Sequence, residues 1–558
     1  MLCRKQGDTI NRIDSTENQA FGLDGPDLFL RQIHNCQNPF PDELLGGIAL
    51  GDLGGSFQDA DLLTAIQPQQ NRRFLGGLKV LSCQDLRHPD VQRFEIRVCT
   101  FRSSHGPKFA NFAKMKETHP KDFAPLTQVQ WESTAVKSLK GKLLSDIQLT
   151  RFDGVAMPIW SDVAPEHVGI SRRAISAPEA GMPWQIQQTI EQPEDVANAL
   201  MHGVQGLRVS AAACARWGLE ELLKGVFTEM VDIHLDGPEA TGMLRALMRL
   251  QDRRSDALGQ PIALTGACTL DVLRSDWDVS EGQSRLHRHI TSWSSAFPAF
   301  RTWGADGSPW LETGMDAIDV MAWMLTGLDA QWNAWQSNGL IGEEVLQHAV
   351  LQWSVGTEVL VEAAALRALR RLWSKWLQFR GLNDVPVWID AKTNPIRFER
   401  WKPEDNLLRC TASGYAAALG AADGMEVLPH DVLANDASSP EAKRWARNVQ
   451  HLLIEESGIQ STHDPLQGSR VVEHLTEQFV GKAWDTFQEL MSKGTPRPHA
   501  WLEERIKAGR LHRLSEGMFR PSDAPAVEGA EGGEDVVWDD LGRPLPWFLV
   551  DHLQSQKG

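Results

Sequence analysis

The chain has 558 residues and a formal net charge of −17, with 56 Lys and Arg against 73 Asp and Glu. A general nucleic-acid-binding protein draws its affinity from clustered basic residues that release phosphate counterions, so this charge balance argues against that class. No apolar run reaches the ~18 residues of a membrane-spanning helix, and the first residues lack the apolar stretch of a secretory signal, so we expect a cytoplasmic protein with no membrane partner.

The cysteines are scattered along the chain without a Cys-x-x-Cys pair, which predicts reduced thiols and no metal site. The aromatic residues are unevenly divided among their types, with 21 Trp, 20 Phe and a single Tyr, Tyr415. Any phenol chemistry of this chain is therefore limited to Tyr415. The seven cysteines are Cys3, Cys36, Cys83, Cys99, Cys214, Cys268 and Cys410.

Residues 1–114 mix Gly, Gln, Asn and Pro with short apolar islands and show no sustained periodicity, so we predict an irregular amino-terminal extension. Two interpretations are open. The extension is either an arm that contacts a partner, or it is not native because translation starts at Met115, whose following residues look like an ordinary amino terminus. We favour the second.

Residues 115–180 are predicted to lead into the main domain. Their pattern indicates a helix over residues 131–140, followed by two extended runs that meet at a tight turn at Asp153 and Gly154. We therefore expect one helix and an extended segment before the regular part of the chain begins.

From residue 181 to residue 480, short apolar runs alternate with amphipathic stretches such as residues 359–379 and 442–456, in which one helix face is apolar. Strands that alternate with helices pair in parallel through right-handed crossovers, and eight such units close into a barrel. We predict an α/β fold, a (β/α)8 TIM barrel, with a doubly wound open sheet as the alternative. The eight predicted strands are residues 206–213, 230–235, 261–267, 300–306, 351–356, 385–390, 407–411 and 425–429.

Residues 481–558 are predicted to form carboxy-terminal helices and a short acidic, Gly-rich tail. No further alternation of strands and helices follows the barrel. A corrin- or nucleotide-binding domain needs about 130 residues. We therefore expect no flavodoxin-like cobalamin-binding domain in this chain.

Several motifs occur in one order along the chain. Residues 406–431 read NLLRCTASGYAAALGAADGMEVLPHD, residues 442–459 read AKRWARNVQHLLIEESGI, and residues 464–476 read DPLQGSRVVEHLT. Upstream lie AALRALRRLW at residues 364–373, and W-x-x-x-A-x-K-x-L-K-G at residues 131–141 with FDGV just after it. In this order the motifs resemble the methylmalonyl-CoA mutase family, over residues 125 to about 515.

Most residues of these motifs suit a scaffold. We expect Asn406 and Arg409 to bracket a strand end and to bond a neighbouring loop. Arg409 or His430 could also reach a ligand at the carboxyl end of the barrel, where such folds keep their sites. Three glycines suit close packing, and two dipeptides suit a turn that leads into a helix: Gly414, Gly420 and Gly424, then Asp464-Pro465 and Gly468-Ser469.

The resemblance implies a barrel through which acyl-CoA threads, with adenosylcobalamin held against its mouth by a separate domain. The signature of that domain is Asp-x-His-x-x-Gly, whose histidine ligates cobalt. The neighbourhoods of Asp464 and Asp551 do not fit it, since Asp551 and His552 lack the intervening residue. We therefore expect a partner subunit, and not this chain, to bind adenosylcobalamin.

The resemblance also identifies catalytic positions that this chain has lost. The family's segment "RQYAGF" carries a catalytic Tyr, and residues 182–191 here read MPWQIQQTIE, so no phenol is present; Trp184, Gln185, Gln187 and Gln188 are left as lining. The family's "YHxxEAG" carries a His that bonds the thioester carbonyl. Here residues 308–317 read SPWLETGMDA, with Pro309 in place of that His and Trp310 beside it. His287, His289 or Trp303 could fill the space instead.

Three functions are compatible with these observations. The first is a non-catalytic small subunit of a heterodimeric methylmalonyl-CoA mutase, which interconverts methylmalonyl-CoA and succinyl-CoA, with no catalytic residue of its own; it would stabilise the catalytic large subunit, where the acyl-CoA binds. The second is the catalytic, substrate-binding subunit of another acyl-CoA mutase that uses a separate cobalamin-binding protein. The third is a stand-alone binding protein or chaperone built on the same barrel.

Overall fold

The computed structural model describes residues 127–148, 154–159, 183–236, 240–273, 296–337, 343–400, 402–434, 437–459, 464–493 and 499–515. All of them belong to one compact unit, Leu126–Gly558. Across these ranges, no helix is both long and apolar enough to span a bilayer.

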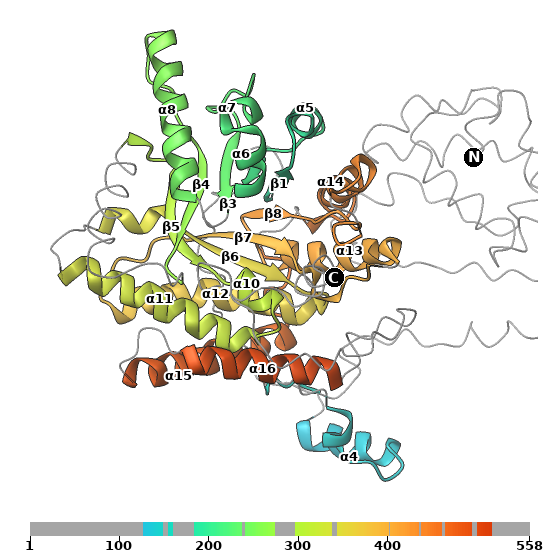
Figure 1. Ribbon diagram of the computed structural model, residues 1–558. Helices are drawn as coiled ribbons and strands as arrows, with labels where there is room; N and C mark the ends of the chain where they lie inside the picture. Colours follow the sequence, from blue (N-terminus) through green and yellow to red (C-terminus); the bar gives the residue numbers. More distant parts are fainter. Residues whose placement is uncertain are drawn as a thin grey trace, which may run out of the picture. The chain divides into compact units, whose positions relative to one another are not determined.

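The centre of this unit is a closed barrel of eight parallel strands that follow one another in sequence order (Figure 1). Strand β1 pairs with β2 on one side and with β8 on the other, through Gln187 opposite Gly206 and Gln185 opposite Gly424, and this closes the barrel. The predicted (β/α)8 barrel is therefore confirmed. The strands are β1 Gln185–Ile190, β2 Gly206–Ser210, β3 Asp232–Asp236, β4 Gly266–Asp271, β5 Phe300–Asp306, β6 Ala349–Val355, β7 Trp388–Thr393 and β8 Gly424–Glu426.

One strand was missed and one predicted strand is wrong, so the predicted total of eight strands still agrees with the structure. The first strand, β1, was not among the predicted strands, because three of its six residues are Gln and it does not read as an apolar run. The predicted strand at residues 407–411 is wrong: these residues lie in helix α13, Asn406–Leu419. Its buried residues Cys410, Ser413, Gly414 and Ala417 recur at helical spacing, which a five-residue window could not reveal.

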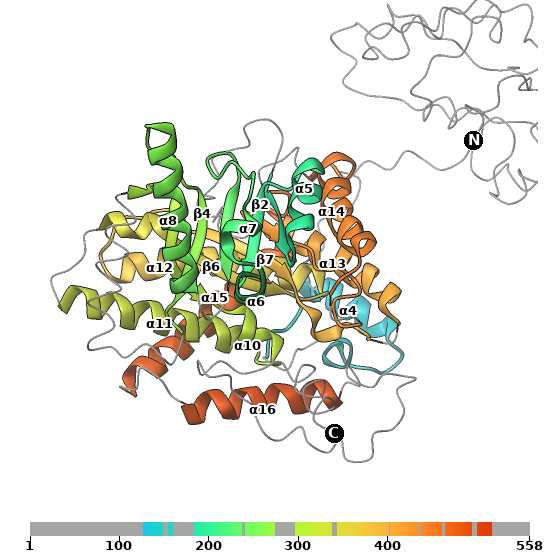
Figure 2. The ribbon, with the colours of Figure 1, turned by 45° about the horizontal axis from the view of Figure 1, so that its top comes forward.

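Helices surround the barrel (Figures 1 and 2). The predicted helix at residues 359–379 is confirmed as α12, and the one at residues 442–456 is α14, shifted by one or two residues. The helices that follow the strands are α5 Pro193–Met201, α6 Ala211–Trp217, α7 Leu219–Leu222, α8 Ala240–Leu258, α10 Ser308–Glu312, α11 Ala317–Ser337, α12 Val359–Phe379, α13 Asn406–Leu419 and α14 Pro440–Glu455, with short 3-10 turns at η9 Glu343–His348, η10 Pro395–Arg397 and η11 Pro403–Asp405.

Helix α15, Arg470–Ser492, packs against α11 and α12 on the outside of the barrel. The turn at residues 464–469 leads directly into it, as predicted. Arg367, fully buried on α12, donates to Asp464 of this turn and to Glu473 of α15, both at 2.5 Å. The motif at residues 464–476 is therefore the joint that fixes α15 on the barrel.

Three further helical segments lie outside the barrel ring. Helix α4, Gln128–Ser138, confirms the predicted amino-terminal helix and begins with a capping box at Thr127. It is followed by a 3-10 turn, η7 Leu144–Ile147, and neither buries a residue. Near the carboxyl end, α16 His499–Ser515 lies against the loop that follows α10, where the buried Arg510 donates to the Thr313 carbonyl oxygen.

Candidate functional site

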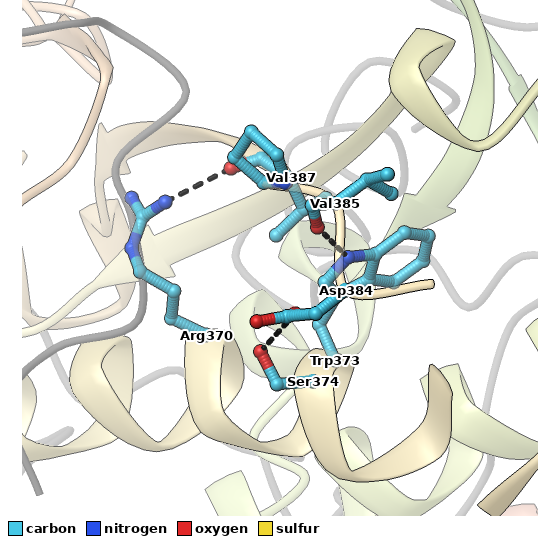
Figure 3. A pocket seen from close by; sticks show the side chains of 7 residues that line it. Arg370, Trp373, Ser374, Asp384, Val385 and Val387 are labelled. Atoms are coloured by element: carbon cyan, nitrogen blue, oxygen red, sulfur yellow. Dashed lines mark hydrogen bonds between the residues drawn. The ribbon is translucent and has the colours of Figure 1, made fainter. Parts of the chain in front are cut away.

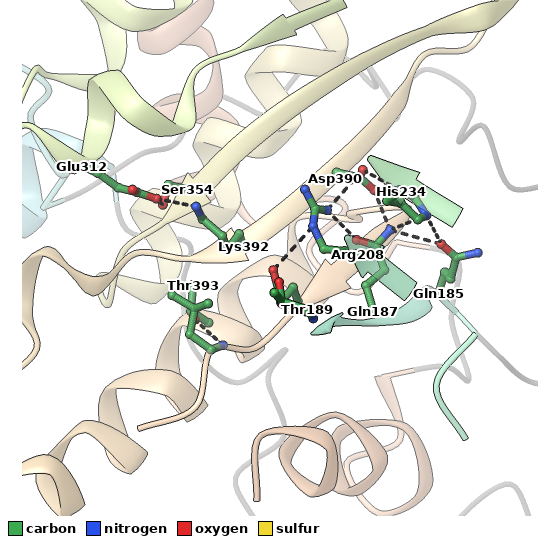
Figure 4. A network of polar contacts seen from close by, with 12 residues as sticks. Gln185, Gln187, Thr189, Arg208, His234, Glu312, Ser354, Asp390, Lys392 and Thr393 are labelled. Atoms are coloured by element: carbon green, nitrogen blue, oxygen red, sulfur yellow. Dashed lines mark hydrogen bonds and ion pairs between the residues drawn. The ribbon is translucent and has the colours of Figure 1, made fainter. Parts of the chain in front are cut away.

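The residues that point into the barrel are polar and charged. Three side chains from the middle of neighbouring or facing strands meet at the barrel axis: Gln187 of β1, Arg208 of β2 and Asp390 of β7 (Figure 4). They are up to 203 residues apart in the sequence. Nη1 of Arg208 donates to Oε1 of Gln187 at 2.7 Å, and Nε2 of Gln187 donates to Oδ1 of Asp390 at 2.8 Å. We name the set Gln185, Gln187, Arg208, His234, Asp390 and Glu426 the axial cluster.

Asp390 is the centre of the axial cluster. Besides Gln187, it accepts from the indole nitrogen of Trp388 at 2.5 Å, and its Oδ2 lies 3.4 Å from Nδ1 of His234 and 3.5 Å from Arg208. Burial alone would raise the pKa of this carboxyl, but the His234 imidazole, together with Arg208 and Trp388, holds the pKa well below its usual range. Asp390 is therefore an ionised carboxylate at every physiological pH.

A second carboxylate holds the other side of Arg208. Glu426 of β8 lies 3.5 Å from Nε of Arg208 and accepts from the backbone N–H of Thr189 at 2.7 Å. Gln352 of β6, with its amide oxygen toward Arg208 at 3.1 Å, donates to Asp306 at 3.2 Å. The guanidinium is thereby enclosed by groups from β1, β6, β7 and β8, which leaves it 6% exposed.

At the carboxyl end of the barrel, Lys392 of β7 forms an ion pair with Glu312 of α10 at 2.8 Å, and Ser354 of β6 donates to the same carboxylate oxygen at 2.9 Å (Figure 4). Burial would lower the pKa of Lys392, but Glu312, with Asp306 and Glu426 nearby, raises it. Lys392 is therefore a stable cation. Its side chain is 29% exposed, so solvent reaches Lys392 at the carboxyl end of the barrel axis.

The amino-terminal end of the axis is closed by a stacked pair. The guanidinium of Arg301 on β5 lies over the ring of Trp388 on β7, 3.6 Å from its centre. Burial lowers the pKa of Arg301, opposed by Asp232 and Asp390. The barrel axis is thus filled from one end to the other by side chains that bind one another.

A small pocket lies outside the axis, between α12 and the residues that immediately precede β7 (Figure 3). Its polar groups already bind one another: Trp373 donates to the Val385 carbonyl oxygen, and Ser374 donates to Asp384. Arg370 donates to the carbonyl oxygen of Val387. The pocket therefore lies at a packing contact between α12 and the segment before β7, and its polar groups are already hydrogen-bonded within the protein.

The four residues at β1 that were predicted to line the site face two opposite sides of the strand. Gln185 and Gln187 point to the axis, whereas Gln188 accepts from Arg447 of α14 and Trp184 donates to Gln450 of α14. The prediction of these four residues as lining is thus correct for two and wrong for two, because successive residues of a strand face opposite sides.

The positions expected to carry the lost donors are now placed. Pro309 lies in the first turn of α10, shortly after β5, and Trp310 is buried against Trp323 with ring centres 5.8 Å apart. Trp303 cannot fill the space, because its ring packs outward on Trp335 at 4.8 Å and its N–H donates to Val345. Tyr415 is half-exposed on the outer helix α13. The candidates His287 and His289 lie outside the described residues.

Arg409 and His430 both serve the scaffold. Arg409, expected at a strand end, lies on α13 and donates to Glu399 at 2.6 Å and to Asn406 at 2.8 Å. His430 stacks on Trp445 of α14 with ring centres 5.1 Å apart. Asn406 donates to the carbonyl oxygen of His430, so these residues tie together the loops that follow β7 and β8.

One stretch that fits the cobalt-ligand pattern was overlooked in the sequence: residues 232–237 read DIHLDG, which is Asp-x-His-x-x-Gly. The structure places Asp232 and His234 on barrel strand β3. His234 is 1% exposed, and its Nε2 lies 3.0 Å from Oε1 of Gln185. An imidazole held in this way cannot reach the metal of a corrin, so the described residues do not fit cobalamin through this motif.

Across the described part of the chain, no group of three or more His, Cys, Asp or Glu residues could hold a metal ion. The residues that sequence reasoning missed are those of the axis, above all Arg208, His234, Asp390 and Lys392. A signal for them exists in the sequence: GLRVS, DIHLD and WIDAKT each place charged residues inside an otherwise apolar strand. In a strand buried on both faces, such residues must find partners.

Comparisons with known proteins agree with the fold. The family described as methylmalonyl-CoA mutase matches residues 193–503. The chain is 29% identical to a methylmalonyl-CoA mutase small subunit of Streptomyces virginiae, over 56% of this chain and 53% of that protein. It is 27% identical to a probable small subunit of Mycobacterium tuberculosis, over 54% and 50%. It is 23% identical to a small subunit of Propionibacterium freudenreichii subsp. shermanii, over 71% and 67%.

The chain spans about half the length of the first two of these relatives. The match to the family covers more than half of this chain and includes β2 to β8 with the helices between them. The family match over more than half of the chain supports one assignment: the chain belongs to the methylmalonyl-CoA mutase family.

Proposed function

We propose that this chain is the non-catalytic small subunit of a heterodimeric, adenosylcobalamin-dependent methylmalonyl-CoA mutase, and that it stabilises the catalytic large subunit. The observation that carries the proposal is the axial cluster, which occupies the space through which the family's acyl-CoA would thread. The similarity to proteins named as small subunits supports it.

Opening the axis for a ligand would separate buried charges. Arg208, at 6% exposure, would lose Glu426 and Asp390, both 2% exposed. Breaking one buried ion pair and leaving a charge unmatched costs about 3–5 kcal/mol. A pantetheine arm has no charge to replace these partners, so threading it here is unfavourable.

Among the described residues, the positions where the family carries its thioester donor offer no such group. Pro309 has no side-chain donor, and Trp310 faces α11. Lys392 is held by Glu312. We therefore assign the bond-breaking chemistry, the acyl-CoA and the adenosylcobalamin to the large subunit, and to this chain a structural task in the cytoplasm.

The test is co-expression with the cobalamin-binding large subunit of the same source organism. We expect the two chains to elute together from a size-exclusion column, and we expect the large subunit to lose mutase activity or solubility when this chain is omitted. This chain alone should show neither turnover nor binding of methylmalonyl-CoA in calorimetry. A monomer that ignores the large subunit would refute the proposal.

A second function is favoured by one observation, the exposed edge of Lys392 at the barrel mouth. In that function this chain would be the catalytic, substrate-binding subunit of another acyl-CoA mutase and would take its cobalamin from a separate protein. It requires acyl-CoA binding that the variant Lys392→Met weakens. Calorimetry with wild type and variant separates the two functions.

A further inference from the structure

Helix α16 is attached to the barrel through a small contact. Of the side chains that the structure describes in α16, Leu502, Ile506 and Arg510 are buried, together with the backbone at Gly509. Helix α15, by comparison, buries ten residues. An element with few buried contacts opens locally before the rest of the fold. We therefore expect α16 to detach from the barrel more readily than α15.

Two backbones approach each other closely where α16 is attached. A Cβ built on Gly509 would lie 2.1 Å from the carbonyl oxygen of Gly314, in the loop between α10 and α11. Only glycine fits at residue 509 unless the two segments separate. Glycine inside a helix weakens that helix. The close approach to Gly314 therefore explains why a glycine stands inside α16.

The same turn of α16 binds the end of α10. Nε of the buried Arg510 donates to the carbonyl oxygen of Thr313 at 3.1 Å, and Thr313 is the C-cap residue of α10. The last carbonyl groups of a helix have no partner within the helix, and a basic side chain can bind them. One turn earlier, Arg505 lies 3.5 Å from Asp319 in the first turn of α11. Helix α16 therefore holds the carboxyl end of α10 from outside.

The residue before Thr313 reaches the mouth of the barrel. Glu312 is the last residue of α10, and its carboxylate accepts from Ser354 of β6 and pairs with Lys392 of β7 (Figure 4). The backbone of α10 is thus bound by α16 at Thr313, and its side chain at Glu312 is bound by two barrel strands. Because these contacts lie on consecutive residues, a shift of α16 acts directly on the ion pair of Lys392.

We infer that α16 is a strap: it holds the carboxyl end of α10 on the barrel mouth, and its displacement releases Glu312 from Lys392 and exposes this lysine to solvent. Access to the charged side chain at the mouth thereby depends on the carboxy-terminal helix. The inference is independent of the proposed function, because it concerns only how this end of the barrel is closed.

The rate at which Lys392 is acetylated by N-hydroxysuccinimidyl acetate reports the release. Such reagents react with the neutral amine. Burial lowers the pKa of Lys392, and Glu312 is the strongest of the groups that raise it, so loss of Glu312 increases both the neutral fraction and the access of the reagent. Peptide mass spectrometry after short exposures measures the rate, with the exposed Lys224 as the internal reference.

The first variant is Gly509→Ala, which favours the helix itself but places a methyl group on the carbonyl oxygen of Gly314. We expect faster amide hydrogen exchange in α16 and in residues 310–316, and a several-fold faster acetylation of Lys392, with Lys224 unchanged. The matched control is Gly481→Ala on α15, where the added Cβ meets no atom within 4 Å; it should behave as the wild type.

Two results of this experiment would overturn the inference. If α16 exchanges faster in Gly509→Ala while Lys392 is acetylated at the wild-type rate, α16 is released without any effect on the mouth. If exchange in α16 is unchanged, the approach to Gly314 does not hold the helix.

The variant Glu312→Gln tests the order of events. It removes the partner of Lys392 and leaves the contacts of α16 in place. We expect acetylation of Lys392 to be as fast as in Gly509→Ala, with exchange in α16 at the wild-type rate. Acetylation at the wild-type rate would show that Glu312 does not protect the lysine and would contradict the strap.

A measurement on the wild-type chain covers the case in which Gly509→Ala does not fold. At urea concentrations below the global unfolding transition, we expect α16 and residues 310–316 to gain exchange together, and Lys392 to be acetylated faster over the same range, while α15 stays protected. Acetylation of Lys392 that rises only when α15 also exchanges would refute the strap, because the mouth would then open only with the whole fold.

Discussion

Lys443 of α14 lies 2.9 Å from the carboxylate of Asp195 on α5, so the last helix of the barrel is bound directly to the first. The same ammonium group lies 2.6 Å from Glu191, which follows β1. Burial would lower the pKa of Lys443, but these two carboxylates raise it, and the group stays charged. The contact closes the ring of helices as the pairing of β1 with β8 closes the strands.

Substitution of Lys443 by Met should weaken this closure. Asp195 is 8% exposed and would lose its cation, so we expect the free energy of unfolding to fall by about 3 kcal/mol. The control is Arg444→Met on the same helix, whose partner Glu441 is exposed; it should change stability by at most about 0.5 kcal/mol. Urea denaturation followed by circular dichroism measures both. Equal effects of the two substitutions would show that the contact is dispensable.

Arg367 should be the more sensitive position on α12. Its replacement by Leu leaves Asp464 and Glu473 buried without their cation, and we expect a loss of about 3–5 kcal/mol together with release of α15 from the barrel. Hydrogen exchange of α15 amides reports the release.

The triple variant Arg367→Leu, Asp464→Asn, Glu473→Gln removes the unmatched charges as well. It should recover part of the lost stability. If the single and triple variants are equally unstable, the stability lost on replacing Arg367 comes from lost packing and not from unmatched charge.

The glycines of two elements should respond in opposite directions to Ala. A Cβ at Gly304 of β5 would lie 1.7 Å from the carbonyl oxygen of Val350, so Gly304→Ala should force β5 from β6 and reduce soluble protein. At Gly481 of α15 a Cβ meets no atom within 4 Å. Gly481→Ala should stabilise the chain by about 0.5–1 kcal/mol, because Ala is the better helix former. Thermal unfolding decides both signs.

Cys410 should be inert in the native protein. Burial raises the pKa of its thiol to about 12, and the thiol donates to the carbonyl oxygen of Leu428 at 3.2 Å. The reactive thiolate is therefore scarce at neutral pH. With iodoacetamide and peptide mass spectrometry, we expect Cys410 to be modified only after denaturation, whereas the half-buried Cys214 reacts in the folded state. Modification of both at one rate would contradict this.

Acidification should weaken the contact between β5 and the 3-10 turn before β6. Burial lowers the pKa of His348, whose Nδ1 donates to the carbonyl oxygen of Phe300 at 2.9 Å. Because the folded pKa lies below the unfolded one, the neutral ring is favoured by folding. Its contribution is complete above about pH 6.5, the unfolded pKa, and is lost as the pH falls toward the folded pKa.

The measurement is the free energy of unfolding from pH 7.5 down to about pH 5, a range that brackets the unfolded histidine pKa. We expect His348→Gln to show a shallower decline than the wild type, and His202→Gln, at an exposed ring, to follow the wild type. If the free energy of unfolding declines equally in all three chains, the pH dependence comes from titratable groups other than His348.

The sequence by itself determined the alternation of strands and helices, the bounds of α12, and the family. Helical spacing of apolar residues is a local property, so it can be recognised in a single stretch of the sequence. The division at residue 114 and the role of residues 1–114 stay predictions, since they lie outside the described residues. Local pattern failed where it was short or polar: β1 is rich in Gln, and residues 407–411 continue into a helix.

Only the tertiary structure decided what fills the barrel. Arg208 and Asp390 are 182 residues apart, and although each stands in an otherwise apolar strand, nothing local identifies which buried charge is the partner of which. Ring closure brings the inner faces of all eight strands together, and the cost of an unmatched buried charge then selects the partners. The same closure turned DIHLDG, a cobalt-ligand pattern in the sequence, into a barrel strand whose histidine binds Gln185.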